Sequence, residues 1–268
     1  MTESSEYHRA KCKSKHHVGR LDIDWSDPRF STREPSFAEL YEAMGRDGCS
    51  LCFLSDRISR RYIDVYCGDN VTDVDIRSRI RESNGFCNVH AHQLMSTQFS
   101  PLAVAFTYSD ILRKIRRELQ NAEPSNWKSF IPRAIRLFGR KWLRTSENNV
   151  VFSQTKSCPV CTEIDNAEIR YVSTVITHWQ DSLLQERFKS GSALCLPHLT
   201  KTIDAAVDPD LIELLIDVQI THWDQLDFHL AEVVRKADYR FSEERLSDDE
   251  RQALLDVIHV LSGVRGIR

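Results

Sequence analysis

The chain has 268 residues, of which 41% are apolar and 28% charged, and its formal net charge is −3. This composition is ordinary for a soluble globular protein, and the net charge excludes a general attraction to nucleic acid or to an anionic membrane, so any such affinity would be local. No apolar run approaches the roughly 20 residues that a membrane span needs. The first residues lack the apolar core of a secretory signal, so we expect a cytoplasmic protein with reduced thiols.

In the first half of the chain, residues 1–34 are polar and irregular, which predicts a flexible N-terminal tail. A capping box from Ser36 to Glu39 predicts a short helix that ends near Met44. Apolar residues then recur at helical spacing. This spacing predicts three further helices, at residues 52–66, 72–84 and 101–121.

Residues 127–144 contain six basic residues and no acidic residue. On a helix, an apolar stripe that includes Ile135 and Phe138 would lie opposite the arginines. The favoured interpretation is a surface helix packed through its apolar stripe. The alternatives are a contact with nucleic acid, or with an anionic membrane surface or a protein partner. The candidate contact residues are Arg133, Arg136, Arg140, Lys141 and Arg144.

The second half of the chain shows the same helical pattern. Apolar spacing predicts helices at 161–178 and 181–190, and Asp208 followed by Pro209 predicts the start of a long helix. Another capping box, from Ser247 to Glu250, begins the last helix. Because the short apolar run at 150–152 is the sole strand candidate, the sequence predicts an all-α fold, a helical bundle.

One motif occurs twice along the chain. A Cys-x-x-Cys pair is followed by a Cys-x-x-His pair, with 34 residues between the pairs in the first copy and 33 in the second. Flanking residues match as well, since Arg61-Tyr62-Ile63 aligns with Arg170-Tyr171-Val172 at an offset of 109. The repeated residues are Cys49, Cys52, Cys87 and His90 in the first copy, and Cys158, Cys161, Cys195 and His198 in the second.

This repeat predicts two metal sites. Zinc prefers four nitrogen or sulfur ligands in a tetrahedron, and a shell of three thiolates and one imidazole leaves no position for water, which is typical of structural sites. Iron–sulfur clusters are the alternative, because cysteine also builds them and histidine can replace some cysteines. A thioredoxin-like redox pair is disfavoured because no strand precedes either Cys-x-x-Cys. His92 also follows Cys87 but has no counterpart in the second copy.

We expect each copy to hold its own ion, so that the chain forms two tandem metal-knuckle modules. Sharing of ligands between copies remains open, because the sequence does not fix which half-motifs meet. The predicted organisation has five parts. These are a tail at 1–34, a first metal module with its following helix at 35–121, a basic connector at 122–157, a second metal module at 158–203 and a C-terminal helical region at 204–268.

Four separated motifs resemble those of a prokaryotic family of unknown function. Two of them, Cys-Pro-x-Cys and Gly-Phe-Cys-x-x-His, are matched at 158–161 and 85–90. The others are matched at 103–112 and at 235–241, where the sequence is similar to the family's Arg-Lys-His-Asp-Tyr-Arg-Phe signature. The resemblance extends from about residue 47 to residue 266. It implies metal-binding modules and no established activity.

The sequence departs from this family pattern at three places. Ser50 stands where the first Cys-x-x-Cys would have proline, Ala193-Leu194 replaces Gly-Phe, and Ala237 replaces a histidine. None of these changes removes a predicted metal ligand. The change at Ala237 argues against an essential histidine there.

The leading hypothesis for function is therefore a zinc-stabilised interaction or regulatory protein without catalytic activity. Nucleotide-binding glycine motifs and the hydrolase nucleophile motif are missing from the sequence. A redox or electron-transfer protein with iron–sulfur clusters, or a thiol sensor that releases zinc on oxidation, is the second hypothesis. Nucleic-acid binding through residues 127–144 is the third. The sequence does not identify the partner, although a protein partner would fit the leading hypothesis.

Overall fold

The computed structural model describes residues 21, 23–68, 70–97, 100–121, 157–190, 193–241 and 243–264. Every regular element within these ranges is a helix, which confirms the all-α prediction. Most of the predicted tail, the basic segment 127–144 with its five candidate contact residues, and the strand candidate at 150–152 lie outside the described residues. Within the described ranges, no helix combines the length and apolar content of a membrane span.

The chain divides into two compact units. Unit 1 combines residues 1–60 with residues 163–268, and unit 2 consists of residues 61–162. Unit 1 is therefore built from two segments that are far apart in the sequence. The divisions fall within two long helices, α3 (Ser50–Gly68) and α8 (Pro159–His178).

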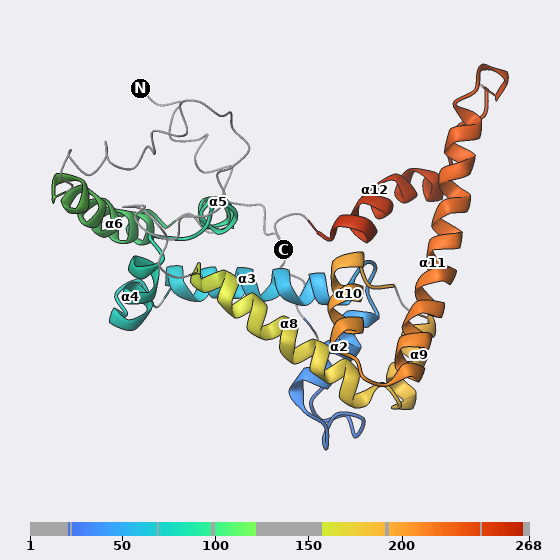
Figure 1. The fold of residues 1–268 in the computed structure, drawn as a ribbon, viewed down its shortest axis with the longest axis horizontal. Coiled ribbons are helices and arrows are strands. Elements are labelled where there is room, and N and C mark those ends of the chain that lie inside the picture. The colour runs from blue at the N-terminus through green and yellow to red at the C-terminus, as the bar shows by residue number, and fades with distance from the viewer. Residues whose placement is uncertain are drawn as a thin grey trace, which may run out of the picture. The chain divides into compact units, whose positions relative to one another are not determined.

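Unit 1 contains one extensive hydrophobic core. Buried side chains from α2, the start of α3, α8, α9, α10 and the start of α11 form it, among them Phe37, Leu54, Leu184 and Leu211. The longest helix of the described chain, α11, has α12 packed beside it (Figure 1). Besides parts of α3 and α8, the elements of unit 1 are α2 (Pro35–Met44), α9 (Ser182–Ser190), α10 (Leu196–Ala205), α11 (Pro209–Lys236), the 3₁₀ turn η3 (Tyr239–Phe241) and α12 (Asp248–Ser262).

The predicted capping box at the start of α2 is wrong. The helix begins two residues earlier than a capping box at Ser36 requires, with Pro35 in its first turn and Glu34 as an N-cap that makes no side-chain hydrogen bond. Proline has the fixed φ of a first helical residue and lacks an N–H that would go unpaired there. Ser36 is instead buried inside the helix, where its hydroxyl accepts a hydrogen bond from Thr174.

The predicted starts of the two C-terminal helices are confirmed. The Asp208 side chain accepts a hydrogen bond from the backbone N–H of Asp210 at the start of α11. Ser247 and Glu250 cap each other's backbone N–H groups at the start of α12. Glu250 also forms an ion pair with Lys236, with 2.7 Å between Nζ and Oε1, and this buried contact joins the end of α11 to α12.

Unit 2 holds the first Cys-x-x-His and the second Cys-x-x-Cys. Besides the end of α3 and the start of α8, it contains α4 (Val74–Glu82), α5 (Asn88–Thr97) and α6 (Pro101–Asn121). The turn after α4 needs a left-handed backbone, with φ of 54° at Asn84 and 102° at Gly85. Glycine adopts this conformation without steric cost. The turn leads the chain from α4 to Cys87 at the start of α5.

Candidate metal centres

Each Cys-x-x-Cys pair lies at the N-terminus of a long helix. Cys49 directly precedes α3 and Cys158 directly precedes α8, while the second cysteine of each pair lies in the first helical turn. The carbonyl groups of Cys49 and Cys158 each accept the first helical hydrogen bond, at 3.0 Å in both copies. The positive end of the helix dipole favours a negative charge at such a position, so both pairs are suited to bind as thiolates.

The Cys-x-x-His pairs start the two short helices α5 and α10, which the sequence analysis did not predict. The carbonyl group of Cys87 accepts a hydrogen bond from Ala91 N–H, and that of Cys195 accepts one from Leu199 N–H, both at 2.8 Å. Cysteine before the helix and histidine in its first turn therefore point to the same side. The turn glycine before Cys87 and Pro197 after Cys195 were the sequence signals for these two helix starts.

The structure gathers all eight repeated residues into two groups, and each group combines half-motifs from both copies. We call Cys49, Cys52, Cys195 and His198 site 1, and Cys87, His90, Cys158 and Cys161 site 2. The expectation that each copy holds its own ion is therefore wrong for this structure. The structure instead matches the alternative, in which each site takes its residues from both copies. Site 1 lies wholly within unit 1 and site 2 wholly within unit 2.

Both groups have the dimensions of one tetrahedral ion. In site 1, His198 Nδ1 lies 3.4 Å from the Sγ atoms of Cys49 and Cys52 and 3.1 Å from that of Cys195. The Sγ atoms of Cys52 and Cys195 are 3.5 Å apart. Tetrahedral zinc with bonds of about 2.3 Å to sulfur and about 2.0 Å to nitrogen gives edges of about 3.8 Å between sulfurs and about 3.5 Å between sulfur and nitrogen.

Site 2 repeats this geometry. His90 Nδ1 lies 3.1 Å from Cys87 Sγ, 3.4 Å from Cys161 Sγ and 3.7 Å from Cys158 Sγ. The Sγ atoms of Cys87 and Cys161 are 3.7 Å apart. In both sites the four ligand atoms lie within 4.8 Å of one another. Both donor sets therefore fit a single thiophilic ion at the centre of four ligands.

Behind site 1, the carboxylate of Glu168 faces the second ring nitrogen of His198. Glu168 Oε1 lies 3.2 Å from His198 Nε2 and accepts a hydrogen bond of 3.2 Å from the Ser55 hydroxyl, and the other carboxylate oxygen pairs with the ammonium of Lys201. Glu168 is only 3% exposed. A carboxylate in this position orients a metal-bound imidazole and raises its basicity. Glu168 was not evident from the repeat, because the aligned residue of the first copy is Ser59.

The sequence comparisons place the chain in a family. A family described as a family of unknown function, DUF6062, matches residues 38–262. The chain belongs to this family. The matched range of DUF6062 contains all eight residues of the two sites.

One curated relative aligns with this chain over its whole length. It is an uncharacterized 23.9 kDa protein in the xynA 3′ region of Caldicellulosiruptor sp. (strain Rt8B.4), 25% identical over 230 residues, which cover 84% of this chain and 100% of the relative. No solved structure matches the chain. The comparisons therefore assign this DUF6062 chain to a family without assigning it a reaction, and its chemistry has to be argued from the two sites.

Burial and mutual contacts shift the pKa values of the site residues in the metal-free chain. Burial opposes a charge on His198, but contacts with Cys195, Cys49 and Glu168 outweigh it and raise its pKa to about 11. Burial raises the pKa of Cys161 to about 12. Hydrogen bonds from Cys195 and Cys52 hold the pKa of Cys49 well below its usual value. A metal must displace the bound protons, so uptake should release protons and affinity should fall as pH falls.

The C-terminal Arg-Lys-x-Asp-Tyr-Arg-Phe stretch forms a local network of charged groups. Arg235 pairs with Glu232 at 2.8 Å and with Glu244 at 2.6 Å, and its guanidinium lies 4.7 Å from the centre of the Phe241 ring. Asp238 pairs with Arg240 at 2.6 Å. These contacts connect the end of α11 to the chain that leads to α12. Their charged groups are satisfied by one another, which favours a structural role over a catalytic one.

Proposed function

We propose that this protein binds two zinc ions, one in site 1 and one in site 2, and that both ions are structural. The observation that carries this proposal is the tetrahedral arrangement of three sulfurs and one nitrogen in each site. A complete shell of protein ligands provides no position for a water molecule or a substrate. The chain is then a non-catalytic interaction or regulatory module whose helices are held by the two ions.

The ligand geometry supports a single ion in each site over an iron–sulfur cluster. In a polynuclear cluster the cysteines are distributed over several iron ions. Four ligand atoms within 4.8 Å of one another instead suit one ion. Among single ions, zinc combines a preference for tetrahedral thiolate and imidazole ligands with the absence of redox chemistry.

Two structural ions would contribute strongly to folding. Zinc sites of this kind bind with about 10–16 kcal/mol at neutral pH, and this binding energy acts as folding energy. Site 1 joins the start of α3 to the start of α10, which are separated by more than 140 residues in the chain. It therefore links the two separate segments that form unit 1.

Metal content tests the proposal. The full chain would be purified without oxygen, and its metals would be measured by mass spectrometry beside its absorption spectrum. We expect two zinc ions per chain and no visible absorption. The variants Cys195→Ser and Cys161→Ser should each retain one ion, while Cys67→Ser, which changes a cysteine outside both sites, should retain two. Iron with sulfide and a brown colour would overturn the zinc assignment.

A second candidate function is a thiol sensor at site 2, favoured by the partial exposure of Cys87 and Cys161. Their sulfurs are 3.7 Å apart, so a small movement would allow a disulfide. In a reaction with hydrogen peroxide, the thiolates of Cys87 and Cys161 would each lose one electron and form the S–S bond. The peroxide takes up two electrons and two solvent protons and becomes two water molecules. Site 2 would then keep only two of the four residues that would hold a zinc ion, so its affinity for zinc would fall.

A further inference from the structure

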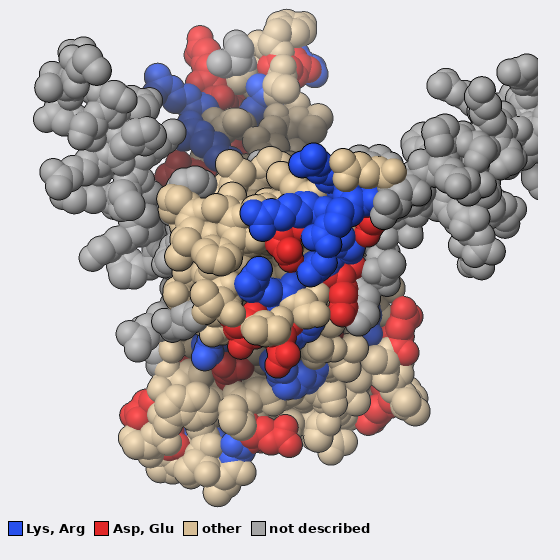
Figure 2. Space-filling model, turned by 90° about the vertical axis from the view of Figure 1, so that its left-hand side faces the viewer, with Lys and Arg blue, Asp and Glu red and all other residues tan. Residues whose placement is uncertain are grey.

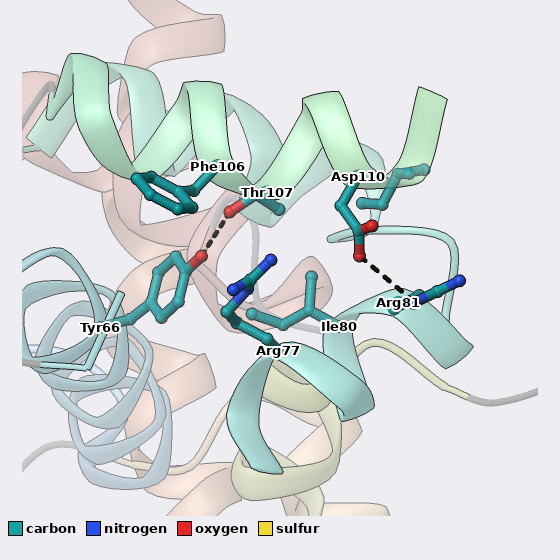
Figure 3. Close-up of a pocket in the computed structure, with 8 residues that line it drawn as sticks. Tyr66, Arg77, Ile80, Arg81, Phe106, Thr107 and Asp110 are labelled. Atoms are coloured by element: carbon teal, nitrogen blue, oxygen red, sulfur yellow. Dashed lines mark hydrogen bonds and ion pairs between the residues drawn. The ribbon is translucent and has the colours of Figure 1, made fainter. Parts of the chain in front are cut away.

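A group of exposed arginines lies along the end of α4 and the second half of α6 in unit 2. The two helices pack against each other in the same direction. The guanidinium of Arg77 lies 5.5 Å from the centre of the Phe106 ring, Arg81 approaches Asp110 at 3.7 Å, and Lys114 donates a hydrogen bond of 2.9 Å to the carbonyl group of Arg81. Figure 3 shows the first two of these contacts. Because residue numbers rise together along both helices, the end of α4 lies beside the middle of α6, at residues 110–114.

The exposed charged residues of this region are all arginines. Over residues 76–84 and 110–121, the acidic residues Glu82, Asp110 and Glu118 are half-buried. Asp73 and Asp75 lie at the opposite end of α4. Figure 2 faces the side where α4 and α6 lie in Figure 1, and it shows lysine and arginine side chains gathered there, with some aspartate and glutamate side chains beside them. We call Arg79, Arg81, Arg113, Arg116 and Arg117 the arginine surface.

This concentration of positive charge is local, because the whole chain has a net charge of −3. Within the part of the chain that the structure describes, no carboxylate lies within ion-pair distance of Arg113, Arg116 or Arg117. The neighbouring Lys114 is used internally, since its ammonium caps the end of α4. Arginine presents a planar fork of donors that matches the oxygens of a phosphate group. The arginine surface is therefore suited to phosphodiester groups.

The ligand must bind on the outside of the two helices. The space enclosed between them has a volume of about 10 Å³, room for a single water molecule. Among the described side chains of residues 76–84 and 110–121, Leu112 is the exposed apolar one, and on α4 and α6 together Phe106 is the single described aromatic side chain that is exposed. An interfacial membrane helix needs a broad apolar face, and a single-strand binder needs aromatic rings for stacking. A duplex backbone requires neither.

We infer that the arginine surface binds the phosphate backbone of double-stranded nucleic acid without reading its base sequence. Phosphate contacts position a protein on a duplex and carry no sequence information of their own. Binding of this type is weak at physiological salt, with dissociation constants of about 10⁻⁴–10⁻⁶ M. The inference does not depend on the identity of the metal in either site. For the interaction module proposed above, it names the phosphate backbone of a nucleic-acid duplex as the binding partner.

Fluorescence anisotropy of the full chain with a labelled DNA duplex of mixed sequence tests this inference. The logarithm of the binding constant should fall linearly with the logarithm of the salt concentration, by about 0.9 for each phosphate neutralised. The double variant Arg113→Glu with Arg117→Glu should weaken binding more than tenfold and reduce this slope by about 2. Arg113→Gln with Arg117→Gln should reduce the slope equally, with a smaller loss of affinity.

A matched control reverses two exposed arginines of unit 1. Arg240 and Arg251 have side chains that are 65% and 59% exposed, and their reversal changes the net charge by the same amount. This control should bind the duplex like the parent protein. Circular dichroism and metal content, measured on every variant, establish that a loss of binding does not come from unfolding or from a lost ion.

Three results would overturn the inference. The first is that the parent protein does not bind the duplex at about 50 mM salt. The second is that Arg136→Glu with Arg140→Glu abolishes binding while the Arg113 and Arg117 variants bind like the parent, which would place the contact in segment 127–144. The third is that the parent binds vesicles containing phosphatidylserine but not the duplex. Each result leaves the measured metal content, and with it the proposed metal sites, unaffected.

Discussion

Site 1 and site 2 have the same four ligand types in the same geometry, but their surroundings differ. In site 1, Cys52 and Cys195 are 1% exposed and His198 is 2% exposed. In site 2, two of the three cysteines, Cys87 and Cys161, are only half-buried. The chain has therefore repeated the ligand set while enclosing the two sets to different degrees.

The residues behind the ligands differ as well. Glu168 and Lys201 form an ion pair behind His198. At the repeat offsets of 109 and 108, the aligned residues of the first copy are Ser59 and Gln93, which are both uncharged. The two half-motifs are therefore enough to arrange four ligand atoms as a tetrahedron. We expect the metal affinity and the solvent exposure of each site to depend on the surrounding residues, which the two copies do not share.

The largest expected effect is that of metal removal. A chelator should destabilise both units, by an amount on the order of 10 kcal/mol for each ion lost. Cys195→Ser should destabilise the chain more than Cys161→Ser, because site 1 joins the two segments around the main core of unit 1. Urea unfolding followed by circular dichroism measures both effects, with Cys67→Ser as the control. Equal destabilisation by the two variants would contradict the difference between the sites.

The next effect is the rate of oxidation. Hydrogen peroxide should release one zinc ion at least about tenfold faster than the second, because thiolate oxidation follows exposure. A chromogenic chelator measures the release, and peptide mass mapping should identify a Cys87–Cys161 disulfide in the early product. Release of both ions at one rate, or an early disulfide between Cys52 and Cys195, would contradict the assignment of site 2 as the accessible site.

Removing the carboxylate behind His198 should have a smaller effect. Glu168→Gln keeps the shape of the side chain but removes its charge, and it should weaken zinc binding at site 1 by about 10–100-fold. Competition with a chelator measures this change in the Cys161→Ser background, which isolates site 1. The same substitution in the Cys195→Ser background is the control, and there the affinity of site 2 should not change.

The smallest effect should come from Lys201→Gln, which places at this position the residue type that the first copy has. The Lys201 side chain is 45% exposed, so water screens its interaction with Glu168. We expect a loss of zinc affinity at site 1 of less than about tenfold. A loss as large as that of Glu168→Gln would mean that the ion pair, rather than the carboxylate alone, supports His198.

The sequence predicted much of the fold because local signals specify helices. Apolar spacing predicted α3, α6 and α8, and the caps at Asp208 and Ser247 predicted the starts of α11 and α12. The eight residues that form the two sites were also evident, because the repeat separates them from Cys67 and His92. The short helices α5 and α10 were missed, because the Cys-x-x-His motif at the start of each was interpreted only as a pair of metal ligands.

The grouping of ligands could not be predicted in this way. A repeat relates positions along the chain, whereas a metal site depends on which segments meet in space. The same holds for the arginine surface, because Arg81 and Asp110 are 29 positions apart in the sequence, and the arginines of α4 and α6 are brought together only when these two helices pack against each other. The basic segment 127–144 was recognised instead because its charges are contiguous. The five-part division of the chain and that segment stay predictions.

The grouping of half-motifs from both copies also makes the two sites nested along the chain. Site 2 joins residues 87 and 90 to residues 158 and 161, and the whole of this loop lies inside the longer loop that site 1 closes between residues 52 and 195. A ribosome therefore completes the inner ligand set first. Cys49 and Cys52, although made earliest, have no complete shell until His198 has been synthesised. The first Cys-x-x-Cys pair to be synthesised therefore belongs to the site whose four residues are completed last.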